Sequence, residues 1–368
     1  MFDVAVIGGG PAGSSAAIVL AQNGLSVVVL ERLERDKLQR GETVPPEIRQ
    51  PLDKLGAWHW FQEEGHRPIS GISSIWGSNE QREIDFIYNP YGNGWVIDRK
   101  RFDAMLAKAA ATAGAQLYDS CKVLGCERKS NQNWIVDSQH HAKRMSVEAR
   151  FVVKATGRAA SVPGLNCGRI VRDGSVALVR YFPMHERMEL DRRPLIEASE
   201  HGWWYSTSLS SEGFVAICVT DASCFRSPAG RPVDFWTDQL GRAPETRDRV
   251  KRCGRSENLH VSVSTCSRSL PGAGEDWLSI GDSAIAFDPL CGHGILNAMK
   301  SGIAGADLIL RGFKKTDLKR YETDLTAAFV QHLNLRAAYY QLERRWGTSP
   351  FWMKRRHPFG ALSSAKWM

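Results

Sequence analysis

The sequence lacks the features that define several large classes of protein. Among its 368 residues, no apolar run reaches the roughly eighteen that a membrane-spanning helix needs. No Cys-x-x-Cys pair and no cysteine–histidine cluster has the spacing of a zinc site, so we expect no metal. The chain begins directly on an apolar segment, residues 2–7, with no basic leader and no cleavage site. These absences argue against a membrane, zinc or secreted protein and predict a cytoplasmic one.

The cysteines and the charge exclude further classes. The eight cysteines are scattered through apolar stretches, so we expect reduced, buried thiols and no disulfide framework. The net charge is +8, and part of the excess lies between residues 344 and 357. No helix-turn-helix, zinc-finger or RNA-binding motif accompanies it, so it does not indicate nucleic acid. An anionic cofactor and an acidic partner surface account for it better.

The N-terminal segment predicts a β-turn-α-β unit. Residues 2–7 have the pattern of a buried strand, residues 12–22 that of a helix of small residues, and residues 26–30 that of a second buried strand. The helix stops at Asn23-Gly24, which is a usual glycine stop. Two buried strands joined by a helix imply a parallel pair with a right-handed crossover.

The turn of this unit, residues 8–13, matches G-x-G-x-x-G. Gly8 permits the tight turn, Gly10 lets the backbone approach a pyrophosphate, and Gly13 lets the helix pack on the strand. The helix N-terminus supplies N–H groups for phosphates. Glu31 follows the second strand, where a carboxylate can accept a hydrogen bond from a ribose hydroxyl. The unit predicts a dinucleotide site, but it does not separate FAD from NAD.

The rest of the chain predicts an α/β fold with a second sheet. We expect helices over 101–113 and 295–310 and strands over 150–155 and 277–280. Residues 70–97 and 168–265 are rich in β-formers, aromatics and turn residues. They predict an antiparallel sheet domain inserted twice into a discontinuous nucleotide-binding domain of residues 1–69, 98–167 and 266–310. Residues 311–368 form a predicted helical segment.

Three further segments resemble a known family. They are R-G-E-T-V-P-P at 40–46, D-R-K-R-F-D at 98–103, and G-D-S-A with the later P-L-C-G-H-G at 281–294. All three are similar to motifs of the p-hydroxybenzoate hydroxylase fold, whose members include flavin monooxygenases, flavin-dependent halogenases and geranylgeranyl reductases. The resemblance implies a Rossmann-like FAD-binding domain with an inserted substrate domain, FAD as the cofactor, and Arg99 near the flavin.

The third segment also has a physical reading. Asp282 can accept a hydrogen bond from a ribityl or ribose hydroxyl, and Gly292 and Gly294 allow backbone to approach the isoalloxazine ring. The helix that begins near Ile295 would point its positive end at the pyrimidine edge and stabilise the anionic reduced ring. The expected FAD-binding residues are Gly8, Gly10, Pro11, Ala12, Gly13, Glu31, Arg32, Arg40, Glu42, Arg99, Val123, Ala155, Gly157, Gly281, Asp282, Pro289, Gly292, Gly294 and Ile295.

A narrower resemblance rests on G-W-W-Y-S at 202–206, on T-D at 220–221, and on the aromatic and basic residues at 345–356. They are similar to the maturation flavoproteins of cysteine tryptophylquinone oxidases, of the glycine oxidase or lysine ε-oxidase type. This implies FAD-dependent oxidation of a tryptophan side chain in a precursor amino-acid oxidase, which would be the partner protein. Strand alternation sends Trp203 and Tyr205 to one face and Trp204 to the other. Either face could roof the flavin pocket, and both could be ordinary sheet core.

The expected catalytic residues are His293 and Trp204. His293 lies between two glycines of the flavin-edge loop, where it could donate a proton or bond only its own loop. Cys291 could be a nucleophile, although a small buried thiol fits equally well. The C-terminal aromatic residues could form a docking surface or a buried closing helix.

Two motifs depart from the family pattern. The D-G-x-x-S segment of aromatic hydroxylases is replaced by A-T-G-R-A-A-S at 155–161, which puts direct reduction by NAD(P)H in doubt. The halogenase W-x-W-x-I-P signature is absent, since the W-H-W-F at 58–61 has no proline. NAD(P)H and reduced flavin both stay open as electron donors. A small-molecule monooxygenase, a halogenase-like enzyme, a prenyl-chain reductase and a flavin-carrying chaperone without turnover stay open as alternative functions.

Overall fold

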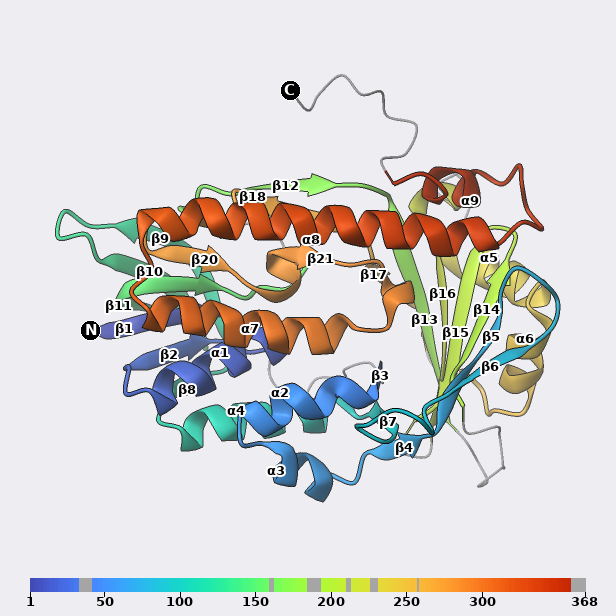
Figure 1. Cartoon of the computed structure of the whole chain (residues 1–368), viewed down its shortest axis with the longest axis horizontal. Helices are drawn as coiled ribbons and strands as arrows, with labels where there is room; N and C mark the ends of the chain where they lie inside the picture. Colours follow the sequence, from blue (N-terminus) through green and yellow to red (C-terminus); the bar gives the residue numbers. More distant parts are fainter. Residues whose placement is uncertain are drawn as a thin grey trace.

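The computed structural model describes residues 1–32, 42–158, 162–183, 193–209, 213–225, 231–256 and 258–358. Over these residues the chain forms two large β-sheets and two small ones, covered by helices (Figure 1). This is the mixed α/β architecture that the resemblance implied. Arg40 lies outside the described residues. Glu42 begins a strand, but the position of its side chain is not described.

The first large sheet has a parallel centre that matches the predicted nucleotide-binding unit. Its strands follow the order β8-β2-β1-β11-β20, and all four neighbouring pairs are parallel. An antiparallel strand β19 and a hairpin of β9 and β10 extend it. The next hairpin, of β10 and β11, turns at His141 and Ala142, both with positive φ. The strands are β1 (Phe2–Ile7), β2 (Val27–Leu30), β8 (Gln116–Tyr118), β9 (Cys121–Arg128), β10 (Trp134–His140), β11 (Lys143–Lys154), β19 (Ala273–Gly274) and β20 (Trp277–Ser279).

Helices α1 (Pro11–Gln22), α4 (Arg99–Thr112) and α7 (Gly294–Leu310) pack into one core with this sheet. Helix α1 and helix α7 lie unusually close, because a Cβ on Gly302 would stand 2.2 Å from the carbonyl oxygen of Ala12. The middle of α7 therefore packs directly against the start of α1. The shorter helices η1 (Pro46–Ile48), α2 (Arg49–Lys54) and α3 (Trp58–Glu63) pack below them (Figure 1).

The second large sheet has seven strands in the order β17-β13-β16-β15-β14-β5-β6 and is antiparallel except for the parallel pair β14 and β5. Helices α5 (Pro232–Gly241) and α6 (Pro244–Lys251) pack near one face through a core around Trp204 and Trp236. The strands are β5 (Gly71–Ile75), β6 (Arg82–Asp85), β13 (Ser175–Pro183), β14 (Leu195–Ser199), β15 (Gly202–Ser208), β16 (Gly213–Asp221) and β17 (His260–Val263), and the turn η2 (Ala222–Cys224) follows β16.

Two small three-stranded sheets join these parts. One contains β3 (Glu42–Val44), β7 (Gly94–Ile97) and β4 (Arg67–Ile69), and the other β12 (Gly168–Val171), β18 (Ser267–Leu270) and β21 (Ile285–Ala286). Both contain a strand, β7 or β12, from a stretch that the sequence assigned to the inserted sheet. The division into FAD-binding, substrate and C-terminal parts stays a prediction.

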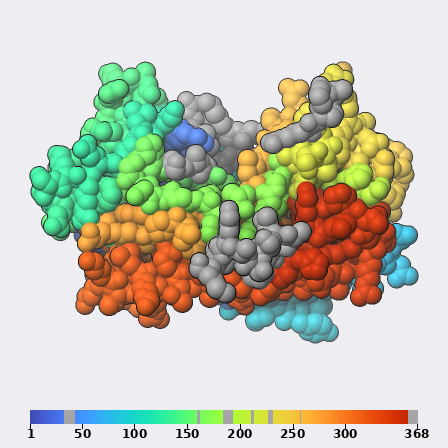
Figure 2. All heavy atoms as spheres, turned by 90° about the horizontal axis from the view of Figure 1, so that it is seen from above, coloured from blue at the N-terminus to red at the C-terminus, as the bar shows by residue number. Residues whose placement is uncertain are grey.

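The C-terminal helices close the molecule along one side. Helix α8 (Lys315–Leu342) runs along the molecule above both large sheets, and the short α9 (Pro350–Arg355) follows at its far end (Figure 1). Phe351 and Trp352 are buried against the second sheet, so these aromatics form a closing helix and not an exposed docking surface. Seen from above, the surface is hollowed between the β9–β10 hairpin and the α5–α6 end (Figure 2).

Candidate functional site

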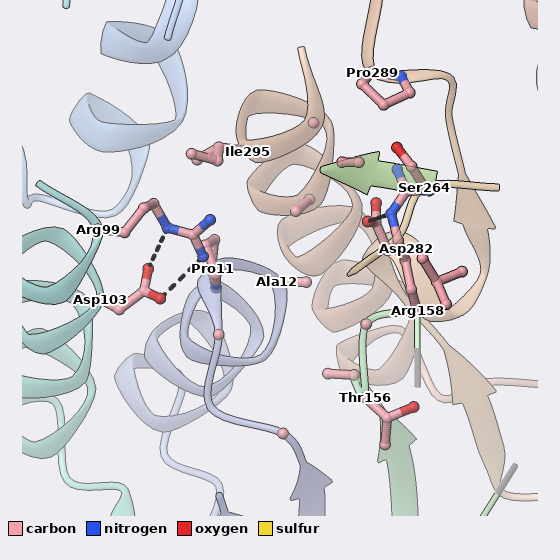
Figure 3. Close-up of a pocket in the computed structure, with 18 of the residues that line it drawn as sticks. Pro11, Ala12, Arg99, Asp103, Thr156, Arg158, Ser264, Asp282, Pro289 and Ile295 are labelled. Atoms are coloured by element: carbon pink, nitrogen blue, oxygen red, sulfur yellow. Dashed lines mark hydrogen bonds and ion pairs between the residues drawn. The ribbon is translucent and has the colours of Figure 1, made fainter. Parts of the chain in front are cut away.

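A cavity of about 920 Å³ lies between the two large sheets. One part of its wall comes from the β1–α1 turn, the ends of β2 and β9 and the start of α7. Another part comes from β13, β14, β15 and β16 of the second sheet. Figure 3 shows the N-terminal end of α1 at Pro11 and Ala12, with Arg99 and Asp103 on one side and Arg158 and Asp282 on the other.

The glycine turn forms part of the wall of this cavity, and two of its glycines stand where there is no space for a Cβ. Gly8 has φ +106°, and a Cβ there would stand 2.3 Å from the carbonyl oxygen of Ala155. A Cβ on Gly13 would stand 1.9 Å from the carbonyl oxygen of Gly8. Gly10 is different, because nothing lies within 4 Å of its Cβ position and it faces the cavity. Two glycines make the turn possible, and the third keeps a ligand's approach open.

Glu31 ends β2 beside this turn and lines the cavity. Its Oε2 accepts a hydrogen bond from the backbone N–H of Gly9 at 2.6 Å. This contact fixes the carboxylate beside the turn, and a carboxylate can accept several hydrogen bonds. Glu31 is therefore held where a ribose hydroxyl of a bound dinucleotide could donate to it.

On the opposite side, Asp282 is held by two arginines. The Arg158 Nε lies 3.0 Å from the Asp282 Oδ2, and Arg169 donates to the Asp282 backbone carbonyl at 2.5 Å. Arg158 also donates to the carbonyl oxygens of Thr265 and Phe287, each at 2.7 Å. Sequence reasoning did not select Arg158, although it is the arginine of the A-T-G-R segment. It ties that segment to the Asp282 turn.

Arg99 and Asp103 form a second fixed pair on the wall. They lie one turn apart at the start of α4, with the Nη2–Oδ2 distance 3.0 Å and the Nε–Oδ1 distance 3.2 Å. The two-point contact holds the guanidinium in one plane. The family resemblance singled out Arg99, and Asp103 is an addition from the structure.

The loop before α7 brings backbone to the cavity. Gly292 has φ +63°, and nothing lies within 4 Å of a Cβ placed on Gly292 or Gly294. Helix α7 begins at Gly294 and is seventeen residues long, so its positive N-terminal end faces the cavity. Pro289 and Ile295 line the same wall.

His293 lies in this loop, and it lines a side cavity of about 200 Å³ with Glu47 and Asn89. Burial of its ring lowers the pKa of His293, and the nearby Glu47 opposes the shift. The side cavity shares Thr43 and Cys291 with the main one. Burial raises the pKa of the Cys291 thiol to about 11, which leaves it protonated near neutral pH and a poor nucleophile.

The other predicted residues lie as follows. Arg32, Val123, Ala155 and Gly157 line the main cavity. Gly13 and Gly281 lie behind its wall, where they permit close packing; a Cβ on Gly281 would stand 2.7 Å from that of Ala12.

The prediction for Trp204 is corrected by its position. Trp204 is fully buried on the far face of the second sheet, with its ring 5.2 Å from that of Trp236. Its neighbours Trp203 and Tyr205 line the cavity instead. Alternation along β15 was predicted correctly, but packing by α5 decides which face is turned away. Trp204 is therefore a core residue that cannot touch a ligand in the cavity.

The chemistry of the lining fits FAD. The Thr156 hydroxyl is buried at the cavity wall with no hydrogen-bond partner, so a polar ligand atom would satisfy it. The open glycine positions leave room for a pyrophosphate at the α1 N-terminus and for a flat ring at the α7 N-terminus. Glu31 and Asp282 provide carboxylates for sugar and ribityl hydroxyls at two sides of the site.

Comparison with known proteins identifies the family. Residues 1–226 match a family model described as an FAD binding domain. The chain belongs to this family. It is an FAD-dependent oxidoreductase with the Rossmann-like fold that the sequence motifs implied, and FAD is its cofactor.

Three relatives extend over nearly the whole chain. The FAD-dependent oxidoreductase LodB of Marinomonas mediterranea is 29% identical, over 99% of each chain. The structure of the myxobacterial chondrochloren halogenase CndH has a TM-score of 0.84 and 21% identity, over 99% of this chain and 87% of that one. The structure of QhpG, a peptidyl tryptophan dihydroxylase essential for tryptophylquinone cofactor biogenesis, has a TM-score of 0.79 and 20% identity, over 98% and 80%.

The described residues offer neither a metal site nor a membrane-spanning helix. No group of three or more histidine, cysteine or acidic side chains there could hold a metal ion. No helix of that part combines the length and apolar character needed to cross a membrane. All eight cysteines are free, but the expectation that they are buried was wrong for Cys224, which is exposed in the η2 turn after β16.

Proposed function

We propose that the protein uses bound FAD to oxidise a tryptophan side chain of a partner amino-acid oxidase while that oxidase forms a cysteine tryptophylquinone cofactor. The observation that carries the proposal is the cavity wall opposite the glycine turn. It is apolar and aromatic, formed by Trp203, Tyr205, Ile196, Ile217 and Val219. An indole packs well on such a surface, because aromatic rings stack or meet edge to face.

The whole-length likeness to LodB and the fold shared with QhpG support the same proposal. QhpG is a peptidyl tryptophan dihydroxylase, so its substrate is a tryptophan within a peptide. The cavity extends from the glycine turn to the second sheet. Among the described residues, its second-sheet wall carries no charged side chain. A neutral aromatic side chain is the substrate class that this wall fits best.

The residues of the chain have distinct roles in this proposal. FAD, when bound, supplies two-electron transfer and reaction with dioxygen. Asp282, held by Arg158, would accept a hydrogen bond from a ribityl hydroxyl, and the α7 N-terminus would stabilise negative charge on the flavin ring. His293 accepts a proton at the side cavity, because burial lowers its pKa and favours the neutral imidazole near pH 7.

The test uses the purified FAD-loaded protein, a reductant, dioxygen and an unprocessed precursor oxidase. Peptide mass spectrometry should find added oxygen, or lost hydrogen, on one tryptophan. A precursor with that tryptophan replaced by phenylalanine is the matched control and should stay unchanged. An unchanged tryptophan in the presence of FAD turnover would overturn the proposal.

A variant separates turnover from a chaperone role. His293→Ala should retain FAD, because His293 lines only the side cavity, and should lose tryptophan oxidation. If both His293→Ala and flavin-free protein still support maturation of the partner, the catalytic proposal fails and a binding role replaces it.

A small-molecule aromatic substrate is the second candidate, favoured by the same apolar wall. The two candidates differ in what competes for the cavity. A free indole that is converted as fast in the absence of the precursor as in its presence would favour the small-molecule role.

A further inference from the structure

A cluster of aromatic side chains extends from Trp203 in the cavity wall into the protein. Apart from Trp203, its members have no role in the proposed reaction. Trp203 lines the cavity and is otherwise buried. Its indole N–H donates to the hydroxyl of Tyr340 at 3.0 Å, and Tyr340 is fully buried on α8. The Tyr340 ring lies 5.6 Å from that of Trp76 and 5.5 Å from that of Trp352, between ring centroids. Trp76 is half-buried, so the cluster reaches from the cavity to the surface.

Tyr340 also has a proton acceptor. Its hydroxyl lies 3.3 Å from both carboxylate oxygens of Asp288, which is itself buried. A tyrosine gives up an electron readily only when its phenolic proton can leave with it. Burial raises the pKa of Asp288, which makes this carboxyl a better proton acceptor than an exposed aspartate.

We propose that Trp203, Tyr340 and Trp76 form an electron-transfer path between the flavin cavity and solvent, with Asp288 as the proton acceptor for Tyr340. The path delivers one electron to an oxidant that forms from dioxygen at the flavin when no substrate is bound, and so reduces it before it damages the protein. The inference rests on FAD binding and on these contacts, and it does not depend on which substrate the protein oxidises.

The transfer balances in electrons and protons. The oxidant takes one electron from Trp203, and Tyr340 gives one electron to Trp203 and its proton to Asp288. Trp76 then gives one electron to Tyr340, which recovers the proton from Asp288. A thiol or ascorbate in solvent restores Trp76 with one electron. The protein is unchanged, the oxidant is reduced by one electron, and the solvent reductant is oxidised by one.

The surroundings favour Trp76 over Trp346 as the surface end of the path. Both rings contact Trp352, with centroids at 5.1 and 5.9 Å. The Arg345 guanidinium lies over the Trp346 ring at 4.4 Å. A cation at that distance opposes formation of a positive indole radical, because like charges repel. The Trp76 indole has a neutral partner, since its N–H donates to the backbone carbonyl of Tyr339 at 2.9 Å.

The experiment is pulsed blue-light excitation of the FAD-loaded protein without substrate, followed by transient absorption of tryptophan and tyrosine radicals. The excited flavin takes one electron from the nearest donor, so it stands in for the oxidant. The wild type should show a long-lived radical phase that ascorbate shortens, because the radical reaches the surface. Trp76→Phe should lose this ascorbate-sensitive phase and show only fast return of the electron from the flavin.

Trp346→Phe is the matched control, because it removes an indole from the same cluster and should keep the ascorbate-sensitive phase. Tyr340→Phe should lose the tyrosine radical signal while keeping the ring packing, and FAD absorption confirms that each variant is loaded. A wild type without a long-lived radical, or a Trp76→Phe variant with the same ascorbate sensitivity as wild type, would overturn the path. Loss of the phase in Trp346→Phe alone would reject Trp76 as its end.

Discussion

Gly10 and Gly13 belong to one turn, yet the residue-scale contacts give them different roles. Gly13 packs against the carbonyl of Gly8, whereas Gly10 faces open space in the cavity. Gly10 has φ −72°, so alanine fits its backbone conformation. Substitution should therefore separate folding from cofactor binding at positions three residues apart.

We predict that Gly10→Ala leaves the free energy of unfolding near wild type and weakens FAD binding, because the new methyl group occupies the ligand's approach. Gly13→Ala should cost about 1–3 kcal/mol of stability, which is typical of overpacking. Urea unfolding and FAD titration measure the two effects. Gly241→Ala, with nothing within 4 Å of its Cβ position, is the neutral control. Equal stability of the Gly10 and Gly13 variants would contradict this account.

At this scale the sequence predicts residues whose chemistry is local. Gly8, Gly13 and Glu31 follow from one short motif, and the structure places them around one turn. Arg158 and Trp204 depend on distant segments. The partners of Arg158 lie more than a hundred residues away, and the packing of α5 and α6 decides that Trp204 faces away from the cavity. No spacing rule in the sequence reports such contacts.

At the scale of elements, α8 holds the flavin-edge loop through one buried stripe. His332, Arg336 and Tyr340 are spaced four residues apart, so they lie on one face of the helix. All three contact Asp288, the residue that begins the loop. Sequence patterning predicted a helical C-terminus, but a stripe that is both polar and buried does not stand out in a hydrophobic pattern.

Removing the cation of this stripe should destabilise the protein strongly. The Arg336 Nη1 lies 2.5 Å from the Asp173 Oδ2 and 3.8 Å from the Asp288 Oδ2, and all three side chains are buried. Arg336→Met should cost about 3–5 kcal/mol, because it removes the ion-pair partner of two buried carboxylates. Urea unfolding checks the value. Arg320→Met, at an exposed ion pair, should change stability by less than about 1 kcal/mol. Similar losses in both variants would refute the buried-pair argument.

The same stripe predicts a pH dependence. His332 Nε2 accepts the Asp288 N–H at 3.0 Å, and burial lowers the pKa of His332 to about 4. Between pH 6.5 and 4 the unfolded chain binds a proton that the folded protein does not, so stability falls as the pH falls through this range. The slope from this residue is about 1.4 kcal/mol per pH unit.

His332→Gln keeps an acceptor for the Asp288 N–H and removes the titrating group. The difference between the wild-type and variant unfolding curves from pH 7 to 4 isolates the histidine, since the neighbouring carboxyls titrate in both proteins. The variant should lose less stability than wild type on acidification. Parallel curves would show that His332 does not titrate as described.

At the scale of the whole molecule, the cavity proposed to hold FAD lies between the two large sheets, so a bound cofactor should stabilise both together. Binding to the folded state alone adds about 2.7 kcal/mol at a ligand concentration 100 times the Kd. We therefore expect FAD to raise the melting temperature in a concentration-dependent way, measured by far-UV circular dichroism. Gly10→Ala should lose most of the rise at the same FAD concentration. A rise that saturates identically in both proteins would argue against the glycine turn as the binding site.

The length of helix α8 also limits how a bulky molecule can enter the cavity between the two sheets. Its 28 residues span roughly 42 Å at 1.5 Å per residue. The Tyr321 hydroxyl, near the start of α8, donates to the carbonyl of Ser279 at the end of β20, and the Tyr340 hydroxyl, near its end, accepts from the Trp203 indole on β15. One continuous helix is thus bonded to the first sheet near its start and to the second sheet near its end, and it holds the two sheets at a fixed separation. The two sheets cannot move apart as a hinge unless α8 breaks, so any substrate has to enter a cavity whose width is fixed.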